Sequence, residues 1–132
     1  MAIDHVSLGV RDLATAAGFY DAALRPLGYA RLVERAGSIG YGRRFPELWI
    51  HARPGMAAVA TDTGCHLALR AASPEVVSAF HAGALKGGGS DDGAPGERAY
   101  SRVRVFAAFV RDPDGNRLEA MTILGELPAA QS

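Results

Sequence analysis

The chain has 132 residues, 48% of them hydrophobic and 21% charged, which is the composition of a globular domain with one core. Its 14 basic and 14 acidic side chains balance, and no apolar run approaches the roughly 20 residues of a membrane span, so neither nucleic acid nor a membrane is expected as a partner. A single cysteine, Cys65, and a first segment unlike a signal peptide predict a cytoplasmic protein.

The first half of the chain predicts one strand, one helix and three further strands. Residues 3–10 alternate between apolar and other side chains, as a half-buried strand does. Asp12 stands where it can cap the following helix, and Pro26 with Gly28 ends that helix. The predicted elements are a strand at 3–10, a helix at 13–24, and strands at 29–34, 38–41 and 47–51.

The second half predicts a similar order of elements. Ser73 and Pro74 form a helix start, and the segment Asp112-Pro-Asp-Gly-Asn116 predicts a hairpin turn. Residues 86–99 carry no apolar period and are predicted to form a mobile loop, with room for one short strand, that acts as a lid. The predicted elements are strands at 65–70, 103–110 and 117–123, a helix at 73–85, and a frayed tail at 126–132.

A repeat relates the two halves. At an offset of 61 positions, His5-Val-Ser-Leu8 falls on His66-Leu-Ala-Leu69, and Phe19 falls on Phe80. A match at one fixed period indicates a supersecondary unit that is used twice. It also places a histidine at the start of the first strand of each unit, so we expect a site shared between the halves.

The sequence resembles the vicinal oxygen chelate superfamily, which includes glyoxalase I, extradiol ring-cleaving dioxygenases, fosfomycin-modifying enzymes and bleomycin-resistance proteins. The segments that carry the resemblance are 5–13, the pair Phe19-Tyr20, and 108–119, and it extends over residues 3–122. It implies an α+β fold in which two βαβββ modules, at about 3–55 and 63–124, form an incomplete barrel within one domain at 1–125. It also implies a homodimer whose subunits complete each other's sites.

The resemblance further implies a divalent metal ion (iron, manganese, nickel or zinc) with His5, His66 and Glu119 as ligands. For the fourth position of the family, Glu47 is the acidic candidate, and Trp49 on the same strand face is the alternative that leaves only three ligands. Two imidazoles and a carboxylate suit a metal with open positions. The competing interpretation makes the histidines core residues and Glu119 a rim charge, but buried glutamates are rarely unpaired.

Further side chains are candidates for contact with a small-molecule substrate. Trp49 offers a flat wall for stacking, Arg117 a bidentate contact to an anion, and Tyr100 a hydroxyl donor. Each has a competing role in packing, in a salt bridge or at the surface, and no catalytic residue is assigned. The substrate-contact candidates are Trp49, His51, Arg70, Tyr100, Phe106 and Arg117.

The sequence therefore predicts a metal-dependent enzyme that acts on a small molecule chelating through adjacent oxygens. Lyase or isomerase chemistry and ring-cleaving dioxygenase chemistry both fit. The alternative is a metal-free protein of the bleomycin-resistance type, which sequesters a drug between subunits with Trp49 and Phe106 as stacking surfaces. A scaffold without activity is a third possibility that no residue favours.

Overall fold

The structure, a computed structural model, describes residues 2–127. Its first module has the predicted order of elements. Asp12 caps α1 by accepting a hydrogen bond from the Thr15 amide at 2.9 Å, and Gly28, at a φ of 84°, ends the short 3-10 helix that follows. The elements are β1 (Val6–Val10), α1 (Leu13–Leu24), the 3-10 helix (Arg25–Leu27), β2 (Ala30–Arg35), β3 (Ser38–Gly42) and β4 (Leu48–Ala52).

The second module repeats this plan. Ser73 caps α2 through the Val76 amide, with Pro74 at the first helical position, as predicted. Its elements are β5 (Leu67–Arg70), α2 (Pro74–Lys86), β6 (Ser90–Tyr100), β7 (Val103–Arg111) and β8 (Arg117–Glu126). Glu126, expected at the start of a frayed tail, ends β8, and residues 128–132 of that tail lie outside the described residues.

The prediction of a mobile loop at 86–99 is wrong. Most of this segment is β6, an 11-residue edge strand that pairs antiparallel with β7. Its register shifts around Gly93 and Gly96, so β6 is a bulged strand held by backbone hydrogen bonds. Such a strand needs no alternating apolar pattern, which is why the periodicity of the sequence does not reveal it.

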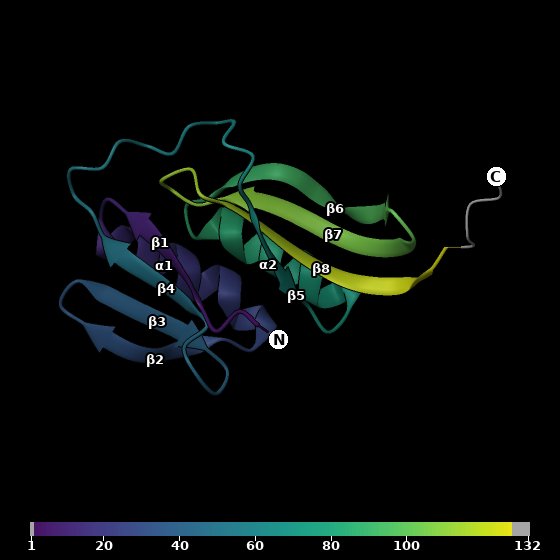
Figure 1. Cartoon of the computed structure of the whole chain (residues 1–132), viewed down its shortest axis with the longest axis horizontal. Coiled ribbons are helices and arrows are strands. Elements are labelled where there is room, and N and C mark those ends of the chain that lie inside the picture. The colour runs from purple at the N-terminus through teal and green to yellow at the C-terminus, as the bar shows by residue number, and fades with distance from the viewer. Residues whose placement is uncertain (1, 128–132) are drawn as a thin grey trace.

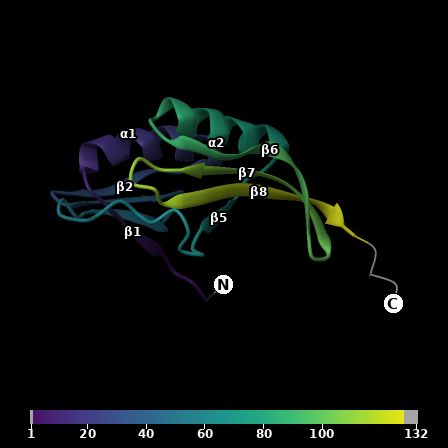
Figure 2. The ribbon, with the colours of Figure 1, turned by 90° about the horizontal axis from the view of Figure 1, so that it is seen from above.

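Residues 2–127 form two four-stranded sheets, with strand orders β1-β4-β3-β2 and β5-β8-β7-β6. In each sheet the first strand of the module pairs parallel with the last one. The sheets lie side by side, and α1 and α2 cover the same face of both (Figures 1 and 2). The sheets do not close on one another, so the predicted incomplete barrel is confirmed. None of the described helices is long and apolar enough to cross a membrane.

One hydrophobic core runs under both helices. Alternate residues of the inner strands point into it, including Leu48 and Ile50 of β4 and Leu118 of β8. They meet Phe19 of α1 and Phe80 of α2, the pair related by the repeat, and all five side chains are at most 1% exposed. The side chains at the intervening strand positions therefore lie on the opposite face of each sheet, which the helices leave uncovered.

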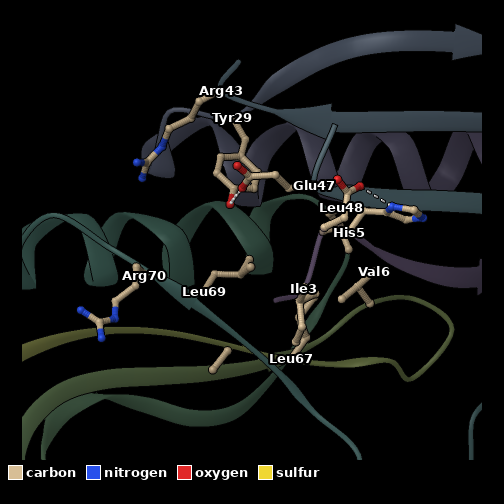
Figure 3. Close-up of a pocket in the computed structure, with 12 residues that line it drawn as sticks. Ile3, His5, Val6, Tyr29, Arg43, Glu47, Leu48, Leu67, Leu69 and Arg70 are labelled. Atoms are coloured by element: carbon tan, nitrogen blue, oxygen red, sulfur yellow. Dashed lines mark hydrogen bonds and ion pairs between the residues drawn. The ribbon is translucent and has the colours of Figure 1, made fainter. Parts of the chain in front are cut away.

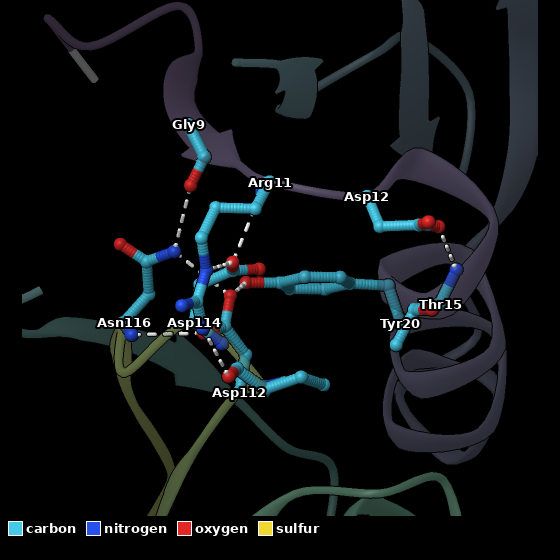
Figure 4. Close-up of polar contacts among 9 residues, drawn as sticks. Gly9, Arg11, Asp12, Thr15, Tyr20, Asp112, Asp114 and Asn116 are labelled. Carbon is cyan, nitrogen blue, oxygen red and sulfur yellow. Dashed lines mark hydrogen bonds and ion pairs between the residues drawn. The ribbon is translucent and has the colours of Figure 1, made fainter. Parts of the chain in front are cut away.

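The turn at 112–116 joins the two modules (Figure 4). The buried Asp112 carboxylate accepts a hydrogen bond from the Tyr20 hydroxyl at 2.7 Å and from the Asp114 and Asn116 amides. Burial, followed by the charge of Asp112, raises the pKa of Tyr20 well above its ordinary value. Asp114 in turn accepts bonds from the Arg11 amide and from Arg11 Nε at 2.7 Å. The turn thus anchors β8 to the β1–α1 connection.

Candidate functional site

His66 and Glu119 meet on the helix-free face of the second sheet. Leu118 and Ala120 point into the core, so Glu119 between them points the other way. Glu119 pairs in register with Ala68, and His66 lies two residues before Ala68. His66 Nε2 lies 3.0 Å from Glu119 Oε1, and the two side chains are 43% and 5% exposed. A buried carboxylate and a half-exposed imidazole thus converge at one point.

The β6–β7 hairpin shields this pair. The ring of Phe109, opposite Glu119 in the register, lies 5.9 Å from the His66 ring, and the Arg98 guanidinium lies 5.3 Å from the centre of the Phe109 ring. Arg98 also donates hydrogen bonds to three backbone carbonyls of β6 and β7. Val105 and Ala107 are fully buried although they lie outside the core cluster. Glu119 therefore stands in a largely desolvated environment, in which a charge needs a partner.

Phe106 does not lie on this face. It packs against the core on the helix side, because even-numbered residues of this part of β7 point inward together with Ala108 and Val110. Phe109 is the aromatic residue that faces the open side, beside His66. Alternation along β7, counted back from the turn at 112–116, distinguishes the inward Phe106 from the outward Phe109 and can be read from the sequence.

Tyr100 ends β6, and Arg117 begins β8. Partial burial, together with the negative charge of Glu119, raises the pKa of Tyr100, while Arg98 opposes the shift. Arg117 stands two residues before Glu119 on the same face of β8, and its Nε donates to Asp92 Oδ2 at 2.9 Å. The contacts of Tyr100 and Arg117 with a substrate stay predictions.

On the first sheet, Trp49 occupies the position that Glu119 occupies on the second. Trp49 pairs in register with Ser7, and Glu119 pairs with Ala68, which is Ser7 shifted by the 61-residue repeat. Both residues stand on the helix-free face. By register, Trp49 and not Glu47 is the first-module equivalent of Glu119, and the ligand role of Glu47 stays a prediction.

A cavity of about 260 Å³ lies over Trp49 and is lined by His5, Ser7, Arg35, Trp49 and His51. The Trp49 and His51 rings stack with centroids 6.0 Å apart and planes 8° apart, and Arg35 lies 5.2 Å from the centre of the Trp49 ring. The His51 ring is fixed between two serine hydroxyls, Ser38 Oγ at 2.6 Å and Ser7 Oγ at 3.2 Å. The first module therefore contributes a rigid, flat surface beside His5.

A larger cleft, of about 430 Å³, lies between the modules and is lined by residues from β1, the start of β4 and β5 (Figure 3). Glu47 lies here, and its Oε2 accepts a hydrogen bond from the Tyr29 hydroxyl at 2.6 Å. Burial, reinforced by Glu47, raises the pKa of Tyr29 to about 12. Arg70 lines the same cleft, and it lies two residues after Ala68, the register partner of Glu119, on the helix-free face of β5. Glu47 is thus engaged with a tyrosine, which gives its predicted ligand role no support.

Of the predicted ligands, one chain brings only His66 and Glu119 together. His5 borders both cavities and is half exposed, and its Nδ1 lies 2.7 Å from Asp4 Oδ1. Within residues 2–127 no three His, Cys, Asp or Glu side chains gather in a group that could hold a metal ion. Cys65 is exposed, because it lies in the loop before β5.

Comparison with known proteins agrees with this architecture. The model of the glyoxalase/bleomycin resistance protein/dioxygenase superfamily matches residues 2–120. A glyoxalase/bleomycin resistance protein from Albidiferax ferrireducens T118 is 33% identical, with a TM-score of 0.80 over 92% of this chain and 98% of that one. A glyoxalase-related enzyme from Fulvimarina pelagi is 20% identical, with a TM-score of 0.70 over 92% of this chain and 87% of that one, and shares the fold. No curated protein matched the chain.

Proposed function

Because this chain belongs to the glyoxalase/bleomycin resistance protein/dioxygenase superfamily, we propose that it binds a divalent metal ion and acts on a small molecule that chelates the metal through adjacent oxygens. The observation that carries the proposal is the contact between His66 Nε2 and Glu119 Oε1 at 3.0 Å, with the glutamate 5% exposed. An imidazole nitrogen and a carboxylate oxygen are donors that suit iron, manganese, nickel or zinc.

The third ligand in this proposal is His5 from a second copy of the chain. One chain supplies two converging donors but no group of three within its described residues. His5 and His66 both lie on faces that the helices leave uncovered. Ile123, further along β8, is 42% exposed and offers an apolar contact for a second copy. In a two-fold symmetric dimer, His5 of each copy faces the His66–Glu119 pair of the other, and two identical sites form.

The chain's own residues would orient the substrate. With Trp49 at the fourth position, the protein supplies three ligands, which leaves sites open for two substrate oxygens. The bound metal ion would act as a Lewis acid on those oxygens. Trp49 would pack against the flat part of the substrate. His51, which two serines hold in place, would accept or donate a proton, and Tyr100 is the second candidate for this role. Ring-cleaving dioxygenase and lyase or isomerase reactions both suit this arrangement.

Metal titration tests the proposal. Protein treated with chelator and then titrated with Co²⁺ should bind one ion per chain, which the visible d–d absorption of bound Co²⁺ reports. His66→Ala and Glu119→Ala should weaken binding at least about tenfold. His81→Ala is a matched control, because His81 Nε2 lies 2.8 Å from Asp91 Oδ1 in an imidazole–carboxylate pair away from the site. Equal losses in all three variants would reject the proposed ligands.

A metal-free binding protein is the second candidate, and the cavity over Trp49 is the observation that favours it. The tryptophan is the only one in the chain, so its fluorescence reports on this cavity directly. If flat aromatic compounds quench it with the same affinity in chelator-treated and Co²⁺-loaded protein, the metal plays no part in binding. Two results would support the metal-dependent enzyme. Loading with Co²⁺ would raise the affinity for the aromatic compound at least about tenfold, or His66→Ala would lower that affinity tenfold.

A further inference from the structure

Two arginines stand directly opposite each other on the helix-free face of the second sheet. Arg111 of β7 pairs in register with Arg117 of β8. Like charges in this position repel one another unless a third group compensates them. The compensating group is Asp92 of β6, whose Oδ2 lies 2.9 Å from Arg117 Nε and whose Oδ1 lies 3.4 Å from Arg111 Nε. One carboxylate serves two guanidinium groups, so the cluster keeps one net positive charge.

The cluster also has hydrogen-bond donors to spare. A guanidinium carries five N–H donors. Arg111 uses Nη2 to bind the Thr61 carbonyl at 3.0 Å, and its Nη1 is buried without a partner in the part of the chain that the structure describes. Arg117 is 29% exposed, and among the described residues only its Nε has a partner. The Nη edge of Arg117 is therefore open for a bidentate contact.

The position of Arg117 links this cluster to the proposed metal site. Arg117 and Glu119 are separated by one residue on the same strand face, which puts their Cα atoms about 7 Å apart. Arg111 is held in place by Asp92 and the Thr61 carbonyl, which fixes the orientation of the cluster. A small molecule whose oxygens reach His66 and Glu119 can therefore extend a second polar group to Arg117.

We propose that Arg117, supported by Arg111 and Asp92, is an oxyanion-binding subsite that selects substrates with a carboxylate or a phosphate a few bonds from the chelating oxygens. Arginine suits this role because its planar fork of donors matches both groups. The proposal depends on the proposed function for the end of the substrate that chelates the metal. The contact with the anion itself requires no metal and can be measured without one.

The test is titration of chelator-treated protein with inorganic phosphate and, separately, with malonate, at constant ionic strength. The readout is the dissociation constant from calorimetry. Wild type should bind at least one probe, and the stronger of the two identifies the anion as phosphate or carboxylate. Arg117→Gln should weaken binding at least tenfold, and Arg117→Lys should be intermediate because it keeps the charge and loses the fork. Asp92→Asn should tighten binding at least threefold, because it removes the competing carboxylate.

Arg104→Gln is the matched control. Arg104 lies on β7, as Arg111 does, and pairs with an acid, Glu97 at 3.1 Å, but both side chains are exposed and the pair lies away from Glu119. This variant should bind the probes as wild type does. The proposal is overturned if wild type binds neither probe. It is also overturned if wild type and the Arg117 variants bind the probes with equal affinity. Circular dichroism establishes that each variant is folded.

The Co²⁺ titration separates the two proposals. Anion binding that depends on Arg117 in a protein that fails to bind Co²⁺ would refute the metal site and keep the subsite. A protein that binds Co²⁺ at His66 and Glu119 but binds neither anion would refute the subsite and keep the metal site.

Discussion

Trp49 and Glu119 occupy equivalent positions in the two modules, Trp49 opposite Ser7 and Glu119 opposite Ala68. The same place in the repeated unit therefore holds a flat ring in one copy and a carboxylate in the other. If both copies carried an acid there, a site built from the two modules would have four protein ligands. In the proposed site, the tryptophan of the first copy leaves three protein ligands and offers a binding surface in place of the fourth.

This equivalence predicts the effect of changing Trp49 to glutamate. A carboxylate at residue 49 should act as a fourth ligand and raise Co²⁺ affinity at least about tenfold, since each added charged ligand contributes strongly at a desolvated metal site. Glu47→Gln is the control and should leave Co²⁺ affinity unchanged, because Glu47 is hydrogen-bonded to Tyr29. A loss of Co²⁺ affinity in Glu47→Gln would return that residue to the ligand set.

Removal of the Tyr20 hydroxyl should destabilise the fold. Tyr20→Phe deprives the buried Asp112 of a hydrogen bond at 2.7 Å, and leaving a buried carboxylate less satisfied costs about 1–3 kcal/mol. Urea unfolding followed by circular dichroism measures this loss. Tyr29→Phe is the comparison, since its hydroxyl binds the exposed Glu47, and its loss should be below about 1 kcal/mol. Similar losses in the two variants would show that the turn network contributes no special stability.

Asp21 should make stability depend on acidic pH. Its pKa is lowered from the ordinary value of 3.8, first by the hydrogen bonds from Arg31. A carboxyl whose pKa is lower in the folded state stabilises the protein above the unfolded pKa, and this contribution disappears as pH falls through the folded pKa. Asp21→Asn should therefore reduce the change in unfolding free energy on acidification below about pH 4. The effect should shrink in high salt, because the pair is partly exposed. An unchanged pH profile would contradict the assigned shift.

Much of the fold could be predicted because its signals are local. The caps at Asp12 and Ser73, the turn at 112–116 and the 61-residue repeat each act within a few residues or through a fixed period, and they led to two βαβββ modules. Strand β6 was missed because backbone pairing through glycine bulges holds it, and such pairing leaves no apolar period.

The site could be predicted only in part, because it depends on relations between strands and, in the proposed dimer, between copies. His66 and Glu119 are in contact because β5 and β8 pair in one register. The choice between Glu47 and Trp49 required the register of β1 with β4, which differing loop lengths hide in the sequence. Phe106 was predicted to contact a substrate, but alternation along β7 turns it toward the core and leaves Phe109 on the open face. In the proposed site, His5 meets His66 and Glu119 of a second copy, and local sequence patterns do not encode how two copies dock.

The central claim is that His5 of one chain and His66 with Glu119 of another form one metal site. Mixing two variants that are each defective in metal binding tests this claim most directly. His5→Ala and Glu119→Ala should each bind Co²⁺ at least about tenfold more weakly than wild type, so at a Co²⁺ concentration that just fills the wild-type sites each binds little. After the two are unfolded and refolded together, half of the dimers should be mixed, and each mixed dimer holds one intact site. The mixture should therefore regain about a quarter of the wild-type Co²⁺ sites. If the mixture binds no more Co²⁺ than the separate variants while sedimentation shows dimers, the site is not shared between chains and the account is wrong.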